Sequence, residues 1–169
     1  MGMEEFALAV VASRPALPPL LPMGFHSTDL AGLQRLCVDY FPGSMARPRL
    51  MSSISMVVTL INRVSIPSRL WVAGSFLTET PEPVDCSLTL VLVDSVFHGL
   101  AEEQREFFDW YRDVPLFEKY RCYNYGIVLD AERADYDAMS AFWLRQYGFH
   151  DQQRKAGVAE LLLPQVSGA

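Results

Sequence analysis

Residues 74–93, GSFLTETPEPVDCSLTLVLV, decide the fold of this chain. The stretch opens with the turn-forming pair Gly74-Ser75 and closes on an apolar run rich in β-branched residues, which is typical of a buried strand. A single aspartate, Asp85, stands where that run begins, and Ser87 follows two positions later. Residues i and i+2 of a strand point to the same face, so Asp85 and Ser87 are expected on one side of the sheet.

The segments on either side alternate between helical and extended patterns. Residues 15–22 are rich in proline, which predicts an extended segment before the first helix. Ser27, Thr28 or Asp29 is expected to cap that helix. His26 is expected to be a turn residue or a packed histidine. Apolar periodicity predicts helices over 30–40, 48–64, 101–110 and 134–147, strands over 69–73, 86–93 and 120–129, and an edge strand or docked tail over 161–163. Such an order predicts an α/β (α+β) fold, one mixed sheet covered by helices.

Length and composition fit one globular domain. The chain has 169 residues, of which 50% are hydrophobic and 20% charged. We expect a domain over 17–163, an N-terminal extension over 1–16 and a tail over 164–169.

The sequence shows no pattern of a signal peptide or a membrane span. The apolar run 6–12 follows Glu4 and Glu5, where a signal peptide would have basic residues, and no run reaches the ~18 apolar residues of a membrane span. These features predict a soluble cytoplasmic protein without a membrane contact.

The charge distribution limits the classes of partner. The net charge is −6 and the sequence has no long Lys/Arg cluster, so direct binding of duplex nucleic acid is not expected, and a protein partner with a basic surface suits the chain better. The charges of segment 101–114 form either a solvated helix face or an acidic patch for a basic partner. Its aromatic residues Phe107, Phe108, Trp110 and Tyr111 are expected in the core, with a binding platform as the alternative.

The three cysteines, Cys37, Cys86 and Cys122, are far apart in the sequence and form no CxxC pair. They predict buried free thiols, neither a disulfide framework nor a zinc site.

A strand, a Gly-Ser turn, a loop and an aspartate on the next strand resemble the signature of the nucleotidyltransferase (polymerase-beta-like) superfamily. More closely, the chain resembles a family of small bacterial proteins of uncharacterised function with this fold. The matching segments are LLPMGFH over 20–26, LWVAGSFLT over 70–78 and PVDCSL over 83–88, and the resemblance extends over about 17–163.

That resemblance implies a specific chemistry at the turn. In such enzymes the glycine lets the backbone approach a phosphate and the serine binds phosphate oxygens. Two carboxylates at i and i+2, with a third from a neighbouring strand, hold two Mg²⁺ ions that carry a nucleoside triphosphate. The third carboxylate is expected on the strand over 120–129.

This chain departs from the superfamily pattern at two of its three carboxylates. Asp85 matches the first, Ser87 replaces the second, and Asn124 in RCYNYG is the best match to the third. Gly74, Ser75, Asp85, Ser87 and Asn124 therefore form a vestigial site, in which Gly74 and Ser75 remain as a phosphate-type turn. One carboxylate holds Mg²⁺ weakly, since Mg²⁺ keeps its water unless several charged oxygens compete, so no catalysis and no cofactor are expected.

Three functions follow from this departure. The first is a non-catalytic binding protein, an antitoxin or immunity protein that neutralises a bacterial toxin. The second is a divergent nucleotidyltransferase that uses Mg²⁺ and a nucleoside triphosphate, with Asp94 or Asp130 joining Asp85 as metal ligands. The third is a nucleotide sensor that retains the Gly74-Ser75 turn.

Overall fold

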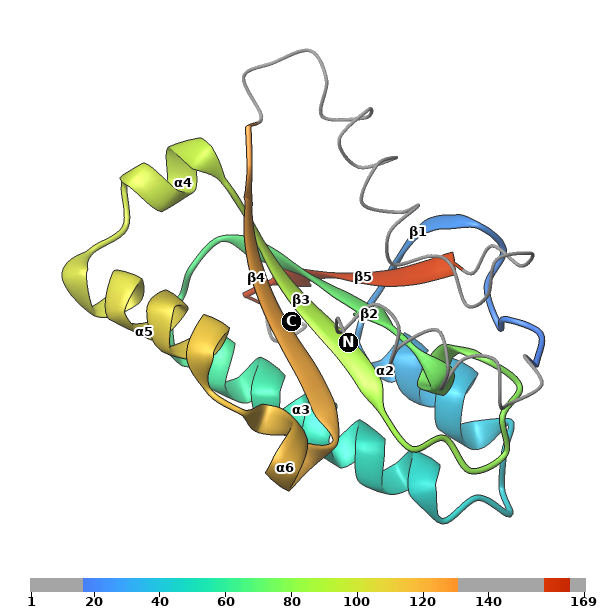
Figure 1. The fold of residues 1–169 in the computed structure, drawn as a ribbon. Coiled ribbons are helices and arrows are strands. Elements are labelled where there is room, and N and C mark those ends of the chain that lie inside the picture. The colour runs from blue at the N-terminus through green and yellow to red at the C-terminus, as the bar shows by residue number, and fades with distance from the viewer. Residues whose placement is uncertain (1–16, 131–156, 165–169) are drawn as a thin grey trace, which may run out of the picture.

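Five strands form one mixed sheet in the computed structural model, which describes residues 17–130 and 157–164 (Figure 1). The strands are β1 (Gly24–Thr28), β2 (Ser68–Ala73), β3 (Cys86–Val93), β4 (Cys122–Leu129) and β5 (Gly157–Leu163). Their order across the sheet is β1-β5-β2-β3-β4. The pairs β1–β5 and β3–β4 are parallel, and β2 is antiparallel to both β3 and β5. The expectation of a mixed α/β fold is therefore confirmed.

Helices connect the strands and cover one face of the sheet. They are α2 (Leu30–Gln34), which continues as the π-helix η1 (Arg35–Asp39), α3 (Ala46–Val64), α4 (Asp94–His98), α5 (Glu102–Asp113) and α6 (Leu116–Tyr120). Asp29 caps α2, because its carboxylate accepts a 2.7 Å hydrogen bond from the amide of Gly32. The helices predicted over 30–40, 48–64 and 101–110 are confirmed. The short helices α4 and α6 were not predicted, since each has five residues and shows no period of its own.

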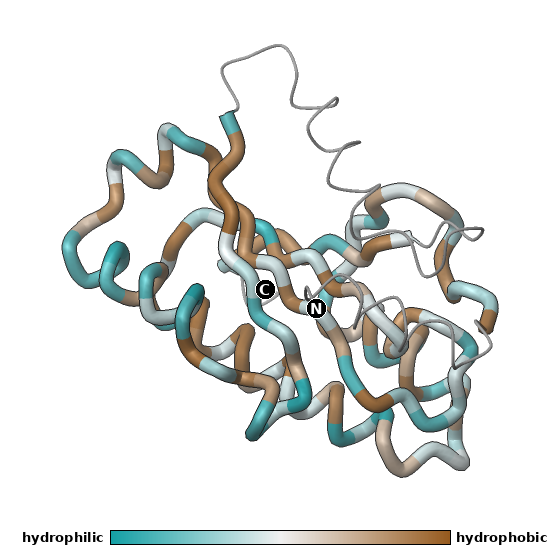
Figure 2. Tube along the Cα trace, viewed as in Figure 1, coloured by the Kyte–Doolittle hydropathy of each residue, from teal (hydrophilic) through white to brown (hydrophobic). Residues whose placement is uncertain are grey.

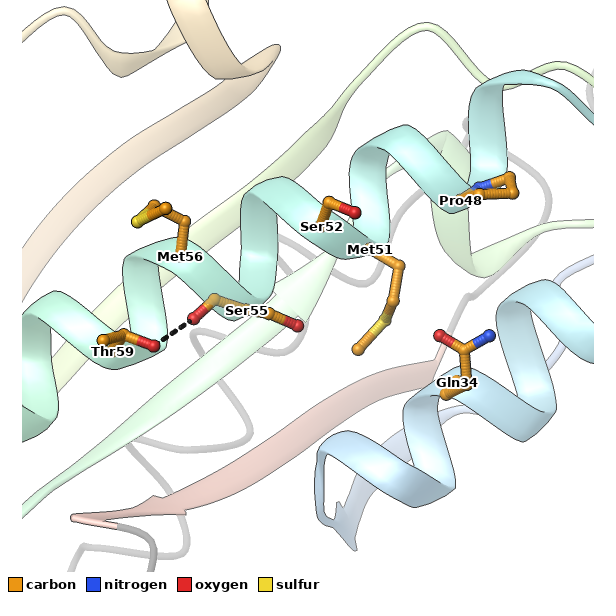
Figure 3. A pocket seen from close by; sticks show the side chains of 7 residues that line it. All are labelled: Gln34, Pro48, Met51, Ser52, Ser55, Met56 and Thr59. Atoms are coloured by element: carbon orange, nitrogen blue, oxygen red, sulfur yellow. Dashed lines mark hydrogen bonds between the residues drawn. The ribbon is translucent and has the colours of Figure 1, made fainter.

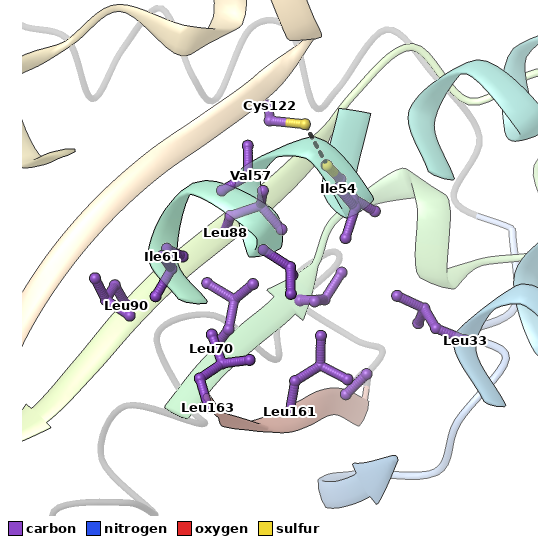
Figure 4. Close-up of a cluster of buried hydrophobic side chains, with 14 of the residues drawn as sticks. Leu33, Ile54, Val57, Ile61, Leu70, Leu88, Leu90, Cys122, Leu161 and Leu163 are labelled. Atoms are coloured by element: carbon purple, nitrogen blue, oxygen red, sulfur yellow. Dashed lines mark hydrogen bonds between the residues drawn. The ribbon is translucent and has the colours of Figure 1, made fainter. Parts of the chain in front are cut away.

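The main core lies between α3, α5 and the sheet (Figure 4). The apolar stripe of α3 is buried against alternate residues of β2, β3 and β5, and hydrophobic residues colour much of the central sheet (Figure 2). The members that carry this contact are Leu50, Ile54, Val57, Val58 and Ile61 on the helix and Leu70, Leu88, Leu90, Leu161 and Leu163 on the strands. Residues of the opposite parity on each strand consequently point to the second face of the sheet.

That second face carries a smaller cluster of its own. Trp71, Val91, Leu129 and Val158 are buried there, one from each of the strands β2 to β5. The indole nitrogen of Trp71 donates a 2.8 Å hydrogen bond to the carboxylate of Glu160 on β5. This face is the one on which the predicted pair Asp85 and Ser87 is expected.

Two strands differ from the sequence expectation. β5 is an interior strand between β1 and β2, so the prediction of an edge strand or docked tail is wrong for its position. β1, which follows the proline-rich segment, was not predicted; it is a strand because Gly24 to Thr28 pair in parallel with Gly157 to Leu161. Gly157 is needed at this junction, since a Cβ there would lie 2.2 Å from the carbonyl oxygen of Pro22. The helix predicted over 134–147 lies outside the described residues.

One buried charge joins the first half of the chain to the turn after β2. Arg47 on α3 exposes 0% of its surface. Its guanidinium donates hydrogen bonds to four backbone carbonyls: Cys37 at 2.9 Å, Phe76 at 2.8 Å, Thr80 at 2.6 Å, and Thr78. These carbonyl dipoles replace water around the charge and fix residues 76–80 against η1 and α3.

We expect Arg47→Met to lower the free energy of unfolding by about 3 kcal/mol or more, because four carbonyls then lose a charged donor in a buried place. Urea denaturation followed by circular dichroism measures the change. Arg49→Met, two positions along at an exposed site, is the matched control and should change stability by less than about 0.5 kcal/mol. Equal losses in the two variants would contradict the role given to Arg47.

Candidate functional site

The turn after β2 places Gly74 against the start of β3. Gly74 has φ 96° and ψ −166°, a backbone conformation that side-chain-bearing residues rarely adopt. A Cβ at this position would lie 3.3 Å from the Cα of Cys86 and 3.4 Å from the amide nitrogen of Ser87. Close approach of two backbones therefore requires glycine here, with or without a phosphate.

Ser75 follows at the start of the 3-10 helix η2 (Ser75–Leu77) and faces Asp85. Its hydroxyl lies 3.1 Å from the Asp85 carboxylate and 3.1 Å from the Asp85 carbonyl oxygen. The serine proton is thus directed at Asp85, and the predicted pair Ser75 and Asp85 is brought together. The Ser75 hydroxyl therefore orients the Asp85 carboxylate.

Ser87 lies on the second face of the sheet, as its spacing from Asp85 predicts. It pairs with Ala73 on β2 and with Tyr123 on β4. The residues of β4 that share this face and lie nearest to Ser87 are therefore Tyr123 and Tyr125. A third carboxylate of a two-metal site would have to occupy one of these two positions, and both hold a phenol.

Asn124 is not part of this site, and the prediction that it takes the third position is wrong. Its neighbour in the parallel register is Leu88, a core residue on the helix-covered face. The side-chain amide donates to the carbonyls of Tyr111 at 2.6 Å and Val114 at 2.7 Å, and its oxygen accepts from the amide of Leu116 at 3.3 Å. Asn124 thereby holds the connection between α5 and α6 to the sheet.

Tyr123 and Tyr125 are the site residues that sequence reasoning missed. Their side chains are 41% and 42% exposed, and Tyr123 stacks on Phe117 with ring centroids 4.3 Å apart. Partial burial raises the pKa of Tyr125, with smaller contributions from Tyr123 and the negative charge of Asp85. The alternation of Tyr123, Asn124 and Tyr125 was visible in the sequence, but its assignment to faces needed the register with β3.

The other two candidate carboxylates lie at the far end of the sheet. Asp94 begins α4 after the last residue of β3, nine residues beyond Asp85, which corresponds to about 30 Å along an extended strand. Asp130 follows Leu129, which pairs with Val93 at that same far end. Since paired metal ions lie about 3.5–4 Å apart, neither aspartate can share a two-metal site with Asp85.

No alternative metal centre takes its place in the described part of the chain. Across residues 17–130 and 157–164, no group of three or more His, Cys, Asp or Glu side chains is arranged to hold a metal ion. The pocket between α2 and α3, with a volume of about 450 Å³, holds amide, hydroxyl and thioether groups (Figure 3). Its lining residues are Gln34, Pro48, Met51, Ser52, Ser55, Met56 and Thr59. None of these can serve as an acid or base at neutral pH.

The three cysteines are buried free thiols, as predicted. Cys86 and Cys122 occupy paired positions of β3 and β4, and their sulfurs are 3.1 Å apart on the helix-covered face (Figure 4). The hydrogen bond that the Cys86 thiol donates to the sulfur of Cys122, together with burial, raises the pKa of Cys86. The Cys86 thiol is therefore held neutral and is a poor nucleophile.

The acidic residues of α5 form a solvent-exposed face. Glu102, Glu103, Glu106, Asp109 and Asp113 are all exposed. Of the four aromatic residues expected in the core, Phe108 and Tyr111 are buried, whereas Trp110 is 44% exposed and lies among the carboxylates. The two arginines of this helix cover other aromatic rings, Arg105 over Phe97 and Arg112 over Phe108.

Fold and site together define a mixed α/β protein in which a Gly-Ser turn meets one carboxylate, Asp85, beside the polar side chains of Ser87, Tyr123 and Tyr125. The chain belongs to a family of unknown function, DUF6932, whose match extends over residues 15–162. No curated protein and no solved structure gives a significant match to the chain. None of the helices in the described ranges is long and apolar enough to cross a membrane.

We expect stability to fall in alkaline solution. Burial raises the pKa of Cys37 from 9.0 to about 12, and the nearby charge of Arg47 opposes this only in part. The neutral thiol is the form that folding favours, so its contribution is complete below pH 9 and is lost as the pH rises from 9 to 12. Each titrating thiol contributes at most about 1.4 kcal/mol per pH unit.

Urea denaturation at several pH values between 7 and 11 measures this dependence. Cys37→Ala should have a flatter decline than the unmodified chain over the same range, because one titrating group is missing. Identical slopes would show that Cys37 does not carry the effect.

Proposed function

We propose that this protein acts by binding another protein, and that it uses a nucleotidyltransferase-like scaffold without the catalytic function. The observation that carries the proposal is the composition of the face around Asp85. Ser87 stands at the second carboxylate position, and Tyr123 and Tyr125 stand where the third would be. A single carboxylate that also accepts a hydrogen bond from Ser75 does not supply the charge that two divalent ions require.

The magnitude of this loss favours a non-catalytic role. Two metal ions stabilise both the attacking and the leaving oxygen in phosphoryl transfer, and each ~1.4 kcal/mol of lost transition-state stabilisation lowers the rate tenfold. Phenol groups cannot replace carboxylates as metal ligands of a two-metal site at neutral pH, because a phenol is ordinarily uncharged there and a carboxylate is charged.

The exposed face of α5 supports a role in protein recognition. Five carboxylates and the partly exposed Trp110 lie on one helix, and tryptophan is among the residues that contribute most to protein interfaces. An acidic face speeds association with a basic partner and selects against acidic ones. The partner we infer is a protein with a basic surface.

Within this class we favour an antitoxin or immunity protein that covers the basic surface of a bacterial toxin in the cytoplasm. Free, buried thiols fit a reducing compartment. The step from a binding protein to a toxin inhibitor rests on the resemblance to small nucleotidyltransferase-like proteins, which is an analogy of fold.

A nucleotide-dependent role is the second candidate, because the Gly74-Ser75 turn and Asp85 still meet. The version that recruits Asp94 or Asp130 conflicts with their position at the opposite end of β3 and β4. A sensor or a divergent nucleotidyltransferase would have to work from Asp85 and the turn alone.

Calorimetric titration with ATP and GTP, with and without Mg²⁺ or Mn²⁺, distinguishes these candidates. We expect no saturable binding at nucleotide concentrations of about 1 mM, which corresponds to less than about 4 kcal/mol of binding free energy. Micromolar, metal-dependent binding that Asp85→Asn abolishes and Asp94→Asn preserves would overturn the proposal in favour of the nucleotide-dependent role.

Co-expression with the products of neighbouring genes tests the binding role directly. We expect a stable one-to-one complex and rescue of growth when the partner is toxic. The double variant Asp109→Asn, Trp110→Ala should weaken the complex about tenfold or more. A matched double variant outside α5, Tyr40→Ala with Glu79→Gln, alters an exposed aromatic and an exposed carboxylate and should leave affinity unchanged. Equal weakening by both variants would contradict a role for the α5 face.

A further inference from the structure

A second pocket is lined by residues of α3, of the loop before β3 and of the end of α6. Figure 1 shows α3 and α6 side by side on the helix-covered side of the sheet. The volume of the pocket is about 270 Å³. The lining residues are Ala46, Arg49, Leu50 and Ser53 on α3, Pro83 and Val84 in the loop, and Lys119, Tyr120 and Arg121 at the end of α6. We refer to it as the basic pocket.

Three cationic side chains line this pocket in a chain whose net charge is −6. They are Arg49, Lys119 and Arg121, and the lining set contains no Asp or Glu. The ion pair in the described ranges joins Arg69 and Glu160, on the other face of the sheet, and none of the three pocket cations takes part in it. Lys119 and Arg121 lie 5.3 Å from the ring centroids of Tyr120 and Phe117, and neither forms an ion pair with a carboxylate of residues 17–130 or 157–164.

The nearest acidic residue in the loop lies at the edge of the pocket and caps α3. Glu82 precedes Pro83, and its two carboxylate oxygens each accept a 2.9 Å hydrogen bond from the amides of Met45 and Ala46 at the start of α3. These backbone hydrogen bonds lower the pKa of Glu82, so it remains charged in this role. Glu82 therefore caps the helix and leaves the hydrogen-bond donors of Arg49, Lys119 and Arg121 available.

The remaining walls of the pocket are apolar or weakly polar. Leu50 and Pro83 are buried, Val84 is 50% exposed, and Tyr120 adds an aromatic ring. Ser53 supplies a hydroxyl that both donates and accepts. A ligand that uses all of these groups has an anionic end for the cations and a compact apolar part for the walls.

We propose that the basic pocket binds a small organic anion, in which a phosphate or carboxylate group is carried on a compact apolar or aromatic body. Arginine guanidinium groups suit both oxyanions, because they donate parallel hydrogen bonds to two oxygens. Pockets for drug-sized ligands measure roughly 300–1,000 Å³, so this pocket suits a smaller molecule.

The site is independent of the proposed binding function. Its lining residues share no member with the exposed acidic face of α5 or with the group Gly74, Ser75, Asp85 and Ser87. Ligand binding in the basic pocket and partner binding by α5 can therefore succeed or fail separately.

Nuclear magnetic resonance titration of the full chain with phenyl phosphate, benzoate and inorganic phosphate tests the proposal. We expect saturable shifts of the Ser53, Val84 and Tyr120 amide signals with phenyl phosphate or benzoate, at a Kd of about 1 mM or lower. Inorganic phosphate should bind about tenfold more weakly, because it leaves the apolar walls unused. The preference between phenyl phosphate and benzoate identifies the oxyanion.

Arg49→Gln and Lys119→Gln should each weaken binding of the preferred probe about fivefold to tenfold, the loss expected for one charge-assisted hydrogen bond. Arg63→Gln removes an exposed charge at the other end of α3 and should change affinity by less than about twofold. The proposal is overturned if neither organic probe gives saturable shifts at the pocket, if Arg63→Gln weakens binding as much as Arg49→Gln, or if inorganic phosphate binds as tightly as the organic probes.

Discussion

The position of the candidate site depends on a buried arginine. Arg47 directs its guanidinium at four carbonyls, and three of them belong to the segment Phe76 to Thr80 that follows the Gly74-Ser75 turn. Cys37 provides the fourth from η1, so the same charge joins two segments that the sequence separates. In a metal-dependent enzyme a bound cation would order such a turn from the substrate side. Here the permanent cation of Arg47 orders the segment that follows the turn from the side of α3.

Strand register decides which side chains share the site. The parallel pairing of β3 and β4 sets Cys86 beside Cys122 on the helix-covered face, which places Ser87 beside Tyr123 on the other. A shift of one residue would have moved Asn124 to the site and both tyrosines to the core. The side-chain amide of Asn124 donates hydrogen bonds to the carbonyls of Tyr111 and Val114. These bonds favour the observed register of β4 against β3, because a shift of one residue would break them.

Local patterns predicted the elements, and long-range pairing limited what else could be predicted. The apolar run of β3 gave its observed bounds, Cys86–Val93, and the stripe on α3 located the core helix. Gly74, Ser75, Asp85 and Ser87 were placed correctly because a turn and a two-residue strand period determine their geometry. β1 and the interior position of β5 were missed, since they depend on pairing between residues far apart in the sequence. Arg47 carries no local signal of burial, and Asn124 could not be assigned to a face without its partner strand.

The place of β5 in the sheet has a consequence for synthesis of the chain. In the described sheet β1 pairs with β5 alone, and β5 also completes the second edge of β2. Until residues 157–163 have left the ribosome, β2, β3 and β4 can pair with one another. During that time one edge of β2 and both edges of β1 have no strand to pair with in the described sheet. Non-local closure of this kind slows folding and exposes an unpaired, apolar strand edge to other chains. The nascent protein is therefore most vulnerable to aggregation just before its final strand arrives.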